Sequence, residues 1–145
     1  MINKIYFDTN IIVDLFDTKR AFHKYSLKTL ENCSLDEDCK IFINSDTMTN
    51  LFYILRAYVK LPLGEALEKL EFIKETFEII SIDDEKITQA IKVCKDEIFN
   101  DYEDALQYIC ALSEDCEYII TNNKKDFRRC NLKLYTSKEF ISNLG

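Results

Sequence analysis

Short apolar runs that alternate with amphipathic segments constrain the fold of this chain more than any other feature of its sequence. Residues 2–7 form a first mostly apolar segment, and the polar residues Asp8, Thr9 and Asn10 separate it from a second mostly apolar segment at 11–16. A short apolar run bounded by polar residues is typical of a buried strand. The expected strands are 2–7, 39–43, 77–82, 118–121 and 132–135.

Helical periodicity fills the segments between these strands. Apolar residues recur at helical spacing, and cap residues such as Ser45 and a first-turn proline, Pro62, mark helix starts. The expected helices are 11–16, 21–33, 44–59, 62–76, 87–94, 102–112 and 137–143. Strands that alternate with helices favour right-handed crossovers. The sequence therefore predicts a three-layer α/β fold with a central parallel sheet of four to five strands.

Length and composition indicate one domain that spans residues 1–145. The 145 residues suit one ordinary domain, and Pro and Gly are too rare to mark a linker. No apolar run approaches the roughly 20 residues that cross a bilayer, and the N-terminus lacks the pattern of a signal peptide. We expect a cytoplasmic protein that does not bind membranes.

The available residue types restrict the chemistry to carboxylates, amides and hydroxyls. The six cysteines form no CxxC pair, and the single His23 cannot complete a Cys/His metal site, so reduced and packed thiols are expected. One histidine and two glycines also exclude a histidine-based triad, a P-loop and a Rossmann fingerprint.

The net charge of −7, from 26 acidic and 19 basic residues, means that the chain as a whole repels nucleic acid. Any contact with nucleic acid therefore has to be local. The basic cluster with Lys124, Lys125 and Arg128 follows the fourth predicted strand. Two other clusters are expected to be solvated surface, namely Lys19, Arg20 and Lys24, and Arg56 and Lys60.

Oxygen-bearing side chains gather after the predicted strands and at one helix start, where ligands bind in parallel α/β sheets. They are Asp8, Asn10, Asp46, Asp101, Asp104, Asn123 and Asp126. Clustered carboxylates repel one another and destabilise a fold unless a cation neutralises them. Oxygen ligands without His or Cys suit Mg²⁺ or Mn²⁺, and such an ion activates water for phosphodiester hydrolysis.

Each acid also has a purely structural interpretation. Asp8 and Asp101 stand where helix caps are favoured. Glu103 and Asp104 suit the positive end of a helix dipole, and Asp126 suits a turn. Spacing alone leaves both interpretations open.

Three segments carry a likeness that spacing does not supply. They are YFDTNIIVDLF, DYEDALQYICAL and YIITNNKKDF, which lie within residues 5–127, and a closing piece LYTSKEFI follows them. In this order they resemble the PIN-domain ribonucleases, and most closely the VapC-type toxins of bacterial toxin–antitoxin modules. The resemblance implies an α/β/α fold, an acidic pocket with Mg²⁺ or Mn²⁺ and endonucleolytic cleavage of RNA. It also implies a homodimer and a small antitoxin protein as partner.

Residue by residue, the resemblance implies that Asp8, Asp104 and Asp126 hold the metal and that Asn123 joins them as a catalytic residue. Asp101 and Glu103 belong to the same pattern in a subset of the family. Thr9, Asn10 and Thr121 would orient water or phosphate. Lys124, Lys125 and Arg128 would draw RNA toward an otherwise acidic mouth.

Asn50 departs from the family pattern, because the family usually carries a glutamate at this position. An amide oxygen coordinates a hard cation but adds no negative charge, so weaker metal binding is expected. Asp46 lies one helical turn earlier and either substitutes in part for the missing acid or simply starts the helix.

The preferred prediction is a metal-dependent endoribonuclease that acts as the toxin of a toxin–antitoxin pair. The alternative is a catalytically impaired PIN-fold protein that binds protein or RNA, since Asn50 and Asn123 are amides where acids are usual. A phosphohydrolase of another α/β fold is disfavoured, because DTNI lacks the second aspartate of a DxD pattern. Phe52, Tyr53 and Tyr58 either form a surface for the antitoxin or pack in the core.

Overall fold

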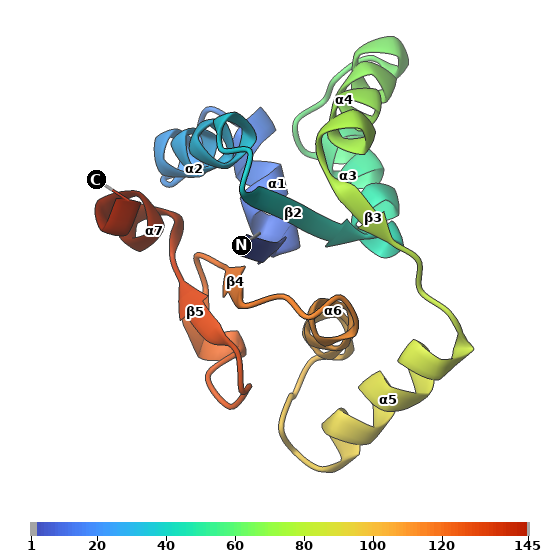
Figure 1. The fold of residues 1–145 in the computed structure, drawn as a ribbon. Helices are drawn as coiled ribbons and strands as arrows, with labels where there is room; N and C mark the ends of the chain where they lie inside the picture. Colours follow the sequence, from blue (N-terminus) through green and yellow to red (C-terminus); the bar gives the residue numbers. More distant parts are fainter. Residues whose placement is uncertain (1–2, 145) are drawn as a thin grey trace.

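A five-stranded parallel sheet runs through the centre of the computed structural model, which describes residues 3–144 (Figure 1). Its strands are β1 (Asn3–Phe7), β2 (Cys39–Asn44), β3 (Glu78–Ile80), β4 (Tyr118–Ile120) and β5 (Lys133–Tyr135). Their order is β3-β2-β1-β4-β5, and each neighbouring pair is parallel. The predicted parallel α/β sheet is therefore confirmed. Ile2, predicted to begin the first strand, lies outside the described residues.

Helices cover both faces of this sheet (Figure 1). The helices of one face are α1 (Thr9–Phe16), α2 (His23–Leu35), α3 (Ser45–Ala57), α4 (Leu63–Thr76) and α7 (Ser137–Leu144). The other face carries α5 (Asp84–Lys95) and α6 (Tyr102–Ser113), and a short 3-10 helix, η1 (Lys124–Asp126), follows β4. No helix among residues 3–144 is long and apolar enough to cross a membrane.

The central strands are apolar on both faces because each face has its own core. In β1, Ile5 and Phe7 pack into the core beside α1 and α3, whereas Tyr6 between them packs into the core beside α6. Side chains of a strand point alternately to its two faces, so a stretch that is covered on both sides is apolar at successive positions. This explains the consecutive apolar residues 5–7 and 41–43.

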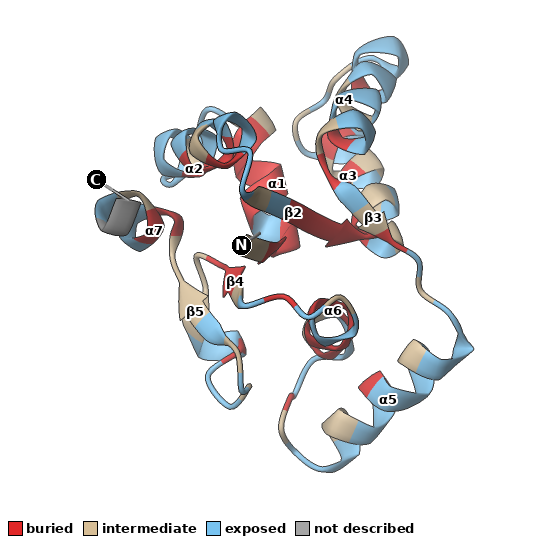
Figure 2. Cartoon of the chain, in the orientation of Figure 1, coloured by how far each residue is buried: buried red, intermediate tan, exposed pale blue. Residues whose placement is uncertain are grey.

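Most predicted helix boundaries differ from the structure by one to three residues at an end. The helix predicted at 87–94 begins earlier, at Asp84, because the Asp83 side chain accepts a 3.0 Å hydrogen bond from the N–H of Lys86 and caps it. Helix α6 is buried continuously from Ala105 to Ala111, between the sheet and α5 (Figure 2). Its depth fixes the position of its first turn against the strand ends.

Candidate active site

The candidate site lies where the strand order reverses, between β1 and β4. Asp8 directly follows β1, and its backbone N–H donates a 3.0 Å hydrogen bond to the carbonyl of Ile120 at the end of β4. In parallel sheets this reversal leaves a crevice beyond the carboxyl ends of the two strands. The first turn of α6 and the segment after β4 close that crevice.

Asp8 is buried at the base of the site, with a side chain bonded on both oxygens. Its Oδ1 accepts a 2.9 Å hydrogen bond from Nε2 of Gln107, and its Oδ2 accepts one of 2.8 Å from Oγ1 of Thr121. Burial raises the pKa of Asp8, and the hydrogen bonds from Thr121 and Gln107 oppose that rise. Asp8 precedes α1, but its side chain makes no capping hydrogen bond to that helix.

The start of α6 supplies three more acids. Asp101 caps the helix, since its Oδ1 accepts a 3.0 Å hydrogen bond from the N–H of Asp104. Burial raises the pKa of Asp104 to about 7, and the nearby carboxylates of Asp8, Asp101, Asp126 and Glu103 add to the rise. The pKa of Glu103 is raised by burial and then by Asp8 and Asp101. These acids therefore share one electrostatic environment.

The segment after β4 brings Asn123 and Asp126 to the same place. The backbone N–H of Asn123 donates to Oγ1 of Thr121 at 3.0 Å, and its side-chain amide donates to the Asp126 carboxylate. The short helix η1 turns the chain so that Asp126 faces α6. Asn123 and Asp126, which were both predicted to follow the fourth strand, are therefore joined by a hydrogen bond between their side chains.

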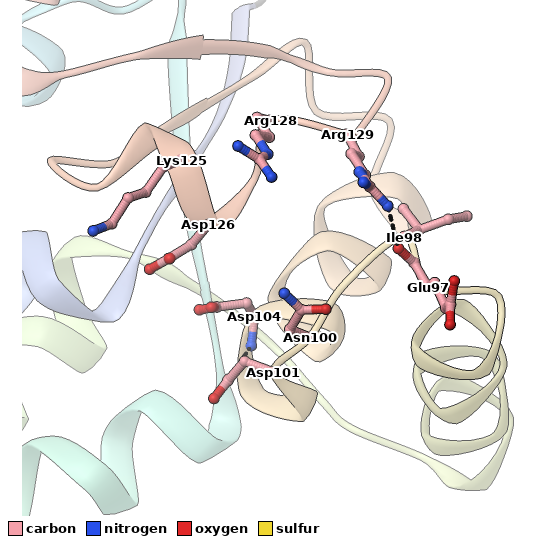
Figure 3. Close-up of a pocket in the computed structure, with 9 residues that line it drawn as sticks. All are labelled: Glu97, Ile98, Asn100, Asp101, Asp104, Lys125, Asp126, Arg128 and Arg129. Carbon is pink, nitrogen blue, oxygen red and sulfur yellow. Dashed lines mark hydrogen bonds between the residues drawn. The ribbon is translucent and has the colours of Figure 1, made fainter.

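A polar cavity of about 330 Å³ opens between the start of α6 and the segment after β4 (Figure 3). The carboxylates of Asp104 and Asp126 turn toward each other there, and the guanidinium of Arg128 lies beside them. The full lining is Glu97, Ile98, Asn100, Asp101, Asp104, Lys125, Asp126, Arg128 and Arg129. The cavity thus combines carboxylates with cations, an arrangement that suits a metal ion and an anionic substrate.

The lining does not include Asp8, Glu103 or Asn123, and the other predicted residues named below lie outside it as well. Thr9 and Thr121 are buried and bonded within the protein, whereas Asn10 is exposed. On α3, Asp46 is exposed and Asn50 is half-buried, and neither lines the cavity. Lys124 forms an ion pair of 3.1 Å with Glu139 on α7, so its charge is partly balanced within the protein, and its contact with RNA stays a prediction.

The donor chemistry of the site fits a hard divalent cation. No three acidic, thiol or imidazole side chains of residues 3–144 stand together as a ready-made metal site. The pKa of Asp104 is raised first by burial and then by repulsion from the neighbouring carboxylates, and a bound cation would relieve that repulsion. Asp8 accepts only one hydrogen bond on each oxygen, and a carboxylate oxygen has two lone pairs, so capacity for a further ligand is left.

Sequence reasoning missed Gln107, and it named Arg129 only as a member of the basic cluster that follows the fourth strand. Gln107 is 1% exposed and bonds directly to Asp8, and its signal in the sequence is a polar residue inside the apolar run of α6. Arg129 donates a 2.8 Å hydrogen bond from Nη1 to the carbonyl of Glu97 and so ties together the two walls of the cavity. No local pattern in the sequence predicts this hydrogen bond between Arg129 and Glu97.

Comparison with known proteins gives a consistent result. A family model described as PIN domain matches residues 4–125. The chain is 33% identical over 138 residues to ribonuclease VapC1 of Aquifex aeolicus, an alignment that covers 94% of this chain and 92% of that protein. Its structure is similar to that of VapC20 of Mycobacterium tuberculosis, a sarcin-ricin loop cleaving toxin, with a TM-score of 0.72, 12% identity and coverage of 89% and 96%. A toxin–antitoxin complex from Klebsiella pneumoniae is similar as well, with a TM-score of 0.65, 23% identity and coverage of 92% and 97%.

Proposed function

The chain belongs to the PIN-domain family, among the VapC-type toxin ribonucleases of toxin–antitoxin modules, and on this basis we propose that it is a metal-dependent endoribonuclease. The family and the α/β/α fold predicted from the sequence are confirmed. The observation that carries the proposal is the position of Asp104 close to the carboxylates of Asp8 and Asp126: burial first, and then these charges, raise its pKa to about 7. The proposed reaction is hydrolysis of an RNA phosphodiester bond.

We propose that Asp8, Asp104 and Asp126 hold a Mg²⁺ or Mn²⁺ ion. Such an ion, when bound, polarises a phosphate oxygen and lowers the pKa of a water. Gln107 and Thr121 keep the Asp8 carboxylate fixed. Asn123 orients Asp126, and Asp101 holds the start of α6 in place through its cap.

RNA is drawn to this acidic site by local cations. Lys125 and Arg128 line the cavity and form no ion pair within residues 3–144, so their charge is available to phosphates. Arg129 is held by the carbonyl of Glu97 and shapes the cavity wall. Because these contacts are electrostatic, the affinity for RNA falls as salt rises.

We propose a small antitoxin protein as partner, together with a homodimer of this chain. The structurally similar complex from Klebsiella pneumoniae supports the antitoxin. On the exposed side of α3 and just after it, Tyr53 and Tyr58 are 64% and 80% exposed. Phe52 instead packs partly against the core. Of the three predicted aromatic residues, the two exposed tyrosines are therefore the ones available to a partner.

Isothermal titration of Mg²⁺ and Mn²⁺ into metal-free protein tests the proposal. We compare the wild type with Asp8→Asn and Asp104→Asn, and use Asp38→Asn as the control. Asp38 is an exposed acid just before β2, so it lies at the amino ends of the strands, whereas the candidate site lies at their carboxyl ends. Binding in the wild type and the control that disappears in both site variants supports the metal site.

Cleavage of RNA by the same proteins completes the test. We expect cleavage by the wild type and by Asp38→Asn, and none by Asp8→Asn or Asp104→Asn. Absence of metal binding and of cleavage in the wild type would overturn the proposal. It would favour a non-catalytic binding module, in which the amides Asn50 and Asn123 stand where the family usually has acids.

A further inference from the structure

Gln107 lies at the centre of a buried chain of hydrogen bonds that ends on Asp8. Its side chain is 1% exposed and sits on α6 with apolar neighbours on both sides in the sequence. A buried amide costs free energy unless both of its polar atoms are bonded. Here both atoms are bonded to the segment that follows β1, some 98 and 99 residues away in the sequence.

The orientation of this amide is set by the backbone. The N–H of Thr9 donates to Gln107 at 3.0 Å. A backbone N–H only donates, so the atom of Gln107 that faces it has to be the acceptor Oε1. The amide nitrogen of Gln107 is thereby turned toward Oδ1 of Asp8, to which it donates at 2.9 Å. If the amide of Gln107 flipped, its nitrogen would face the N–H of Thr9 and its oxygen would face the carboxylate of Asp8, and both hydrogen bonds would be lost.

The second oxygen of Asp8 is fixed by the same logic. Thr121 accepts a 3.0 Å hydrogen bond from the backbone N–H of Asn123, which leaves its hydroxyl hydrogen free to point at Oδ2 of Asp8, 2.8 Å away. Each Asp8 oxygen therefore faces a donor whose direction is dictated by a backbone N–H.

The chain of hydrogen bonds continues behind Gln107 into the sheet. The hydroxyl of Thr9 lies 3.0 Å from that of Thr47 on α3. Thr47 in turn bonds to the side chain of Asn44 at the end of β2, and Asn44 donates to the hydroxyl of Tyr6 at 2.8 Å. The ends of β1 and β2 and helices α3 and α6 are thus joined through buried polar groups. Gln107 is the member of this chain that reaches the acid.

Gln107 also connects Asp8 to the acid on α6. It follows Asp104 by three residues, so the two side chains lie on the same side of the helix. Asp104 lines the cavity, and Gln107, one turn further along α6, donates a hydrogen bond to Asp8. The spacing of the two carboxylates is therefore set by a single rigid element.

We propose that Gln107 is a positioning residue that holds the Asp8 carboxylate at a fixed orientation and spacing relative to Asp104, for a divalent cation between them. This inference rests on the proposed function, because it presupposes that Asp8 and Asp104 hold a metal ion. Gln107 touches neither the ion nor the RNA. Partners that orient a metal ligand in this way commonly change metal affinity by roughly 10- to 100-fold when removed.

Gln107→Met tests the proposal, because methionine keeps the length of the side chain and removes both hydrogen bonds. Thr29→Val is the matched control. Thr29 is buried, and its hydroxyl donates to the carbonyls of Tyr25 at 2.8 Å and Ser137 at 3.2 Å, without a link to Asp8. Both variants remove buried hydrogen bonds, so both lower stability. The readouts are Mn²⁺ affinity by titration calorimetry, the free energy of unfolding, and kcat and KM for RNA cleavage.

We expect Gln107→Met to weaken Mn²⁺ binding by roughly 10-fold or more and to lower kcat while the KM for RNA stays unchanged. Thr29→Val is expected to bind Mn²⁺ as the wild type does. Wild-type Mn²⁺ affinity in folded Gln107→Met would overturn the positioning role and leave the proposed function standing. If the wild type itself neither binds Mn²⁺ nor cleaves RNA, the proposed function fails, and the positioning role with it.

Discussion

The backbone N–H of Asp104 donates a 3.0 Å hydrogen bond to the carboxylate of Asp101, so the residue that caps α6 also places its negative charge beside the acid of the cavity. Capping stabilises the helix, whereas the proximity of two carboxylates destabilises their charged forms. The structural interpretation of Asp101 as a helix cap is therefore confirmed, and the role of these acids in a metal site stays a prediction. Helix α6 begins at this position because of Asp101, and the site acquires its high charge density for the same reason.

The charge of Asp104 lowers the stability of the metal-free protein at high pH. An unfolded aspartate loses its proton near the ordinary pKa of 3.8, whereas Asp104 in the folded protein keeps it until about 7. Between these values the folded state binds more protons, so the free energy of unfolding falls as pH rises. Asp104→Asn removes this effect. We expect it to stabilise the metal-free protein by about 1 to 2 kcal/mol at pH 8, after allowance for solvent screening, and by much less at pH 4.

Urea denaturation at both pH values, without metal and with excess Mn²⁺, measures this difference. The added ion should stabilise the wild type and leave Asp104→Asn unchanged. A variant that is less stable than the wild type at pH 8 without metal would contradict the repulsion between the carboxylates.

Asn50→Glu should strengthen metal binding. It restores the acid that the family usually carries, on α3 next to the site, and adds one negative charge to the ligand environment. We expect the Mg²⁺ affinity to rise by roughly 10-fold, which corresponds to about 1.4 kcal/mol of added attraction. Titration calorimetry provides the measurement. The companion Asp46→Asn tests whether Asp46 contributes, and an unchanged affinity there would show that it does not.

Arg128 and Lys124 should contribute unequally to RNA binding, although they are close in sequence. Arg128 lines the cavity, whereas Lys124 is neutralised by Glu139 at 3.1 Å. Arg128→Ala should lower the affinity for a non-cleaved RNA and reduce the slope of log K against log salt by about one. Lys124→Ala should leave the slope nearly unchanged. Fluorescence anisotropy across a salt series measures both, and equal slopes in the two variants would refute the distinction.

Asp14→Ala should destabilise the fold and loosen the segment that carries Asn123. Asp14 is 2% exposed and accepts hydrogen bonds from Arg20 at 2.6 Å, Ser26 at 2.8 Å and Asn122 at 2.8 Å. Its loss leaves these donors unsatisfied, with an expected cost of about 2 to 4 kcal/mol.

Chemical denaturation of Asp14→Ala beside Asp96→Ala checks this prediction. Asp96 pairs with Lys92 at 2.9 Å on an exposed part of α5, where an ion pair contributes less than about 1 kcal/mol. Similar losses in the two variants would mean that the buried contacts of Asp14 contribute little.

The fold followed from the sequence because its signals are local. The consecutive apolar residues 5–7 and 41–43 indicated strands, and a possible cap at Asp101 indicated where α6 begins. The positions of Asp8, Asp104 and Asp126 followed from their place at strand ends and a helix start, although their role as metal ligands stays a prediction.

The rest of the site depends on contacts between distant segments. In the sequence, Gln107 is one polar residue in an apolar helix, and only the structure shows that it is bonded to Asp8 and Thr9. Lys124 reads as part of a basic cluster until Glu139 is seen beside it. The link from Asn122 to Asp14 spans 108 positions and is invisible to any local pattern.

The pairing of β1 with β4 also determines at what stage of translation the candidate site can form. Asp8 leaves the ribosome early, but its partners Gln107 and Thr121 are added on the order of ten seconds later. A nascent chain that ends before Thr121 lacks the donor to Oδ2 of Asp8 and lacks Asp126, so its site is incomplete. The complete site therefore forms only after most of the chain has been synthesised.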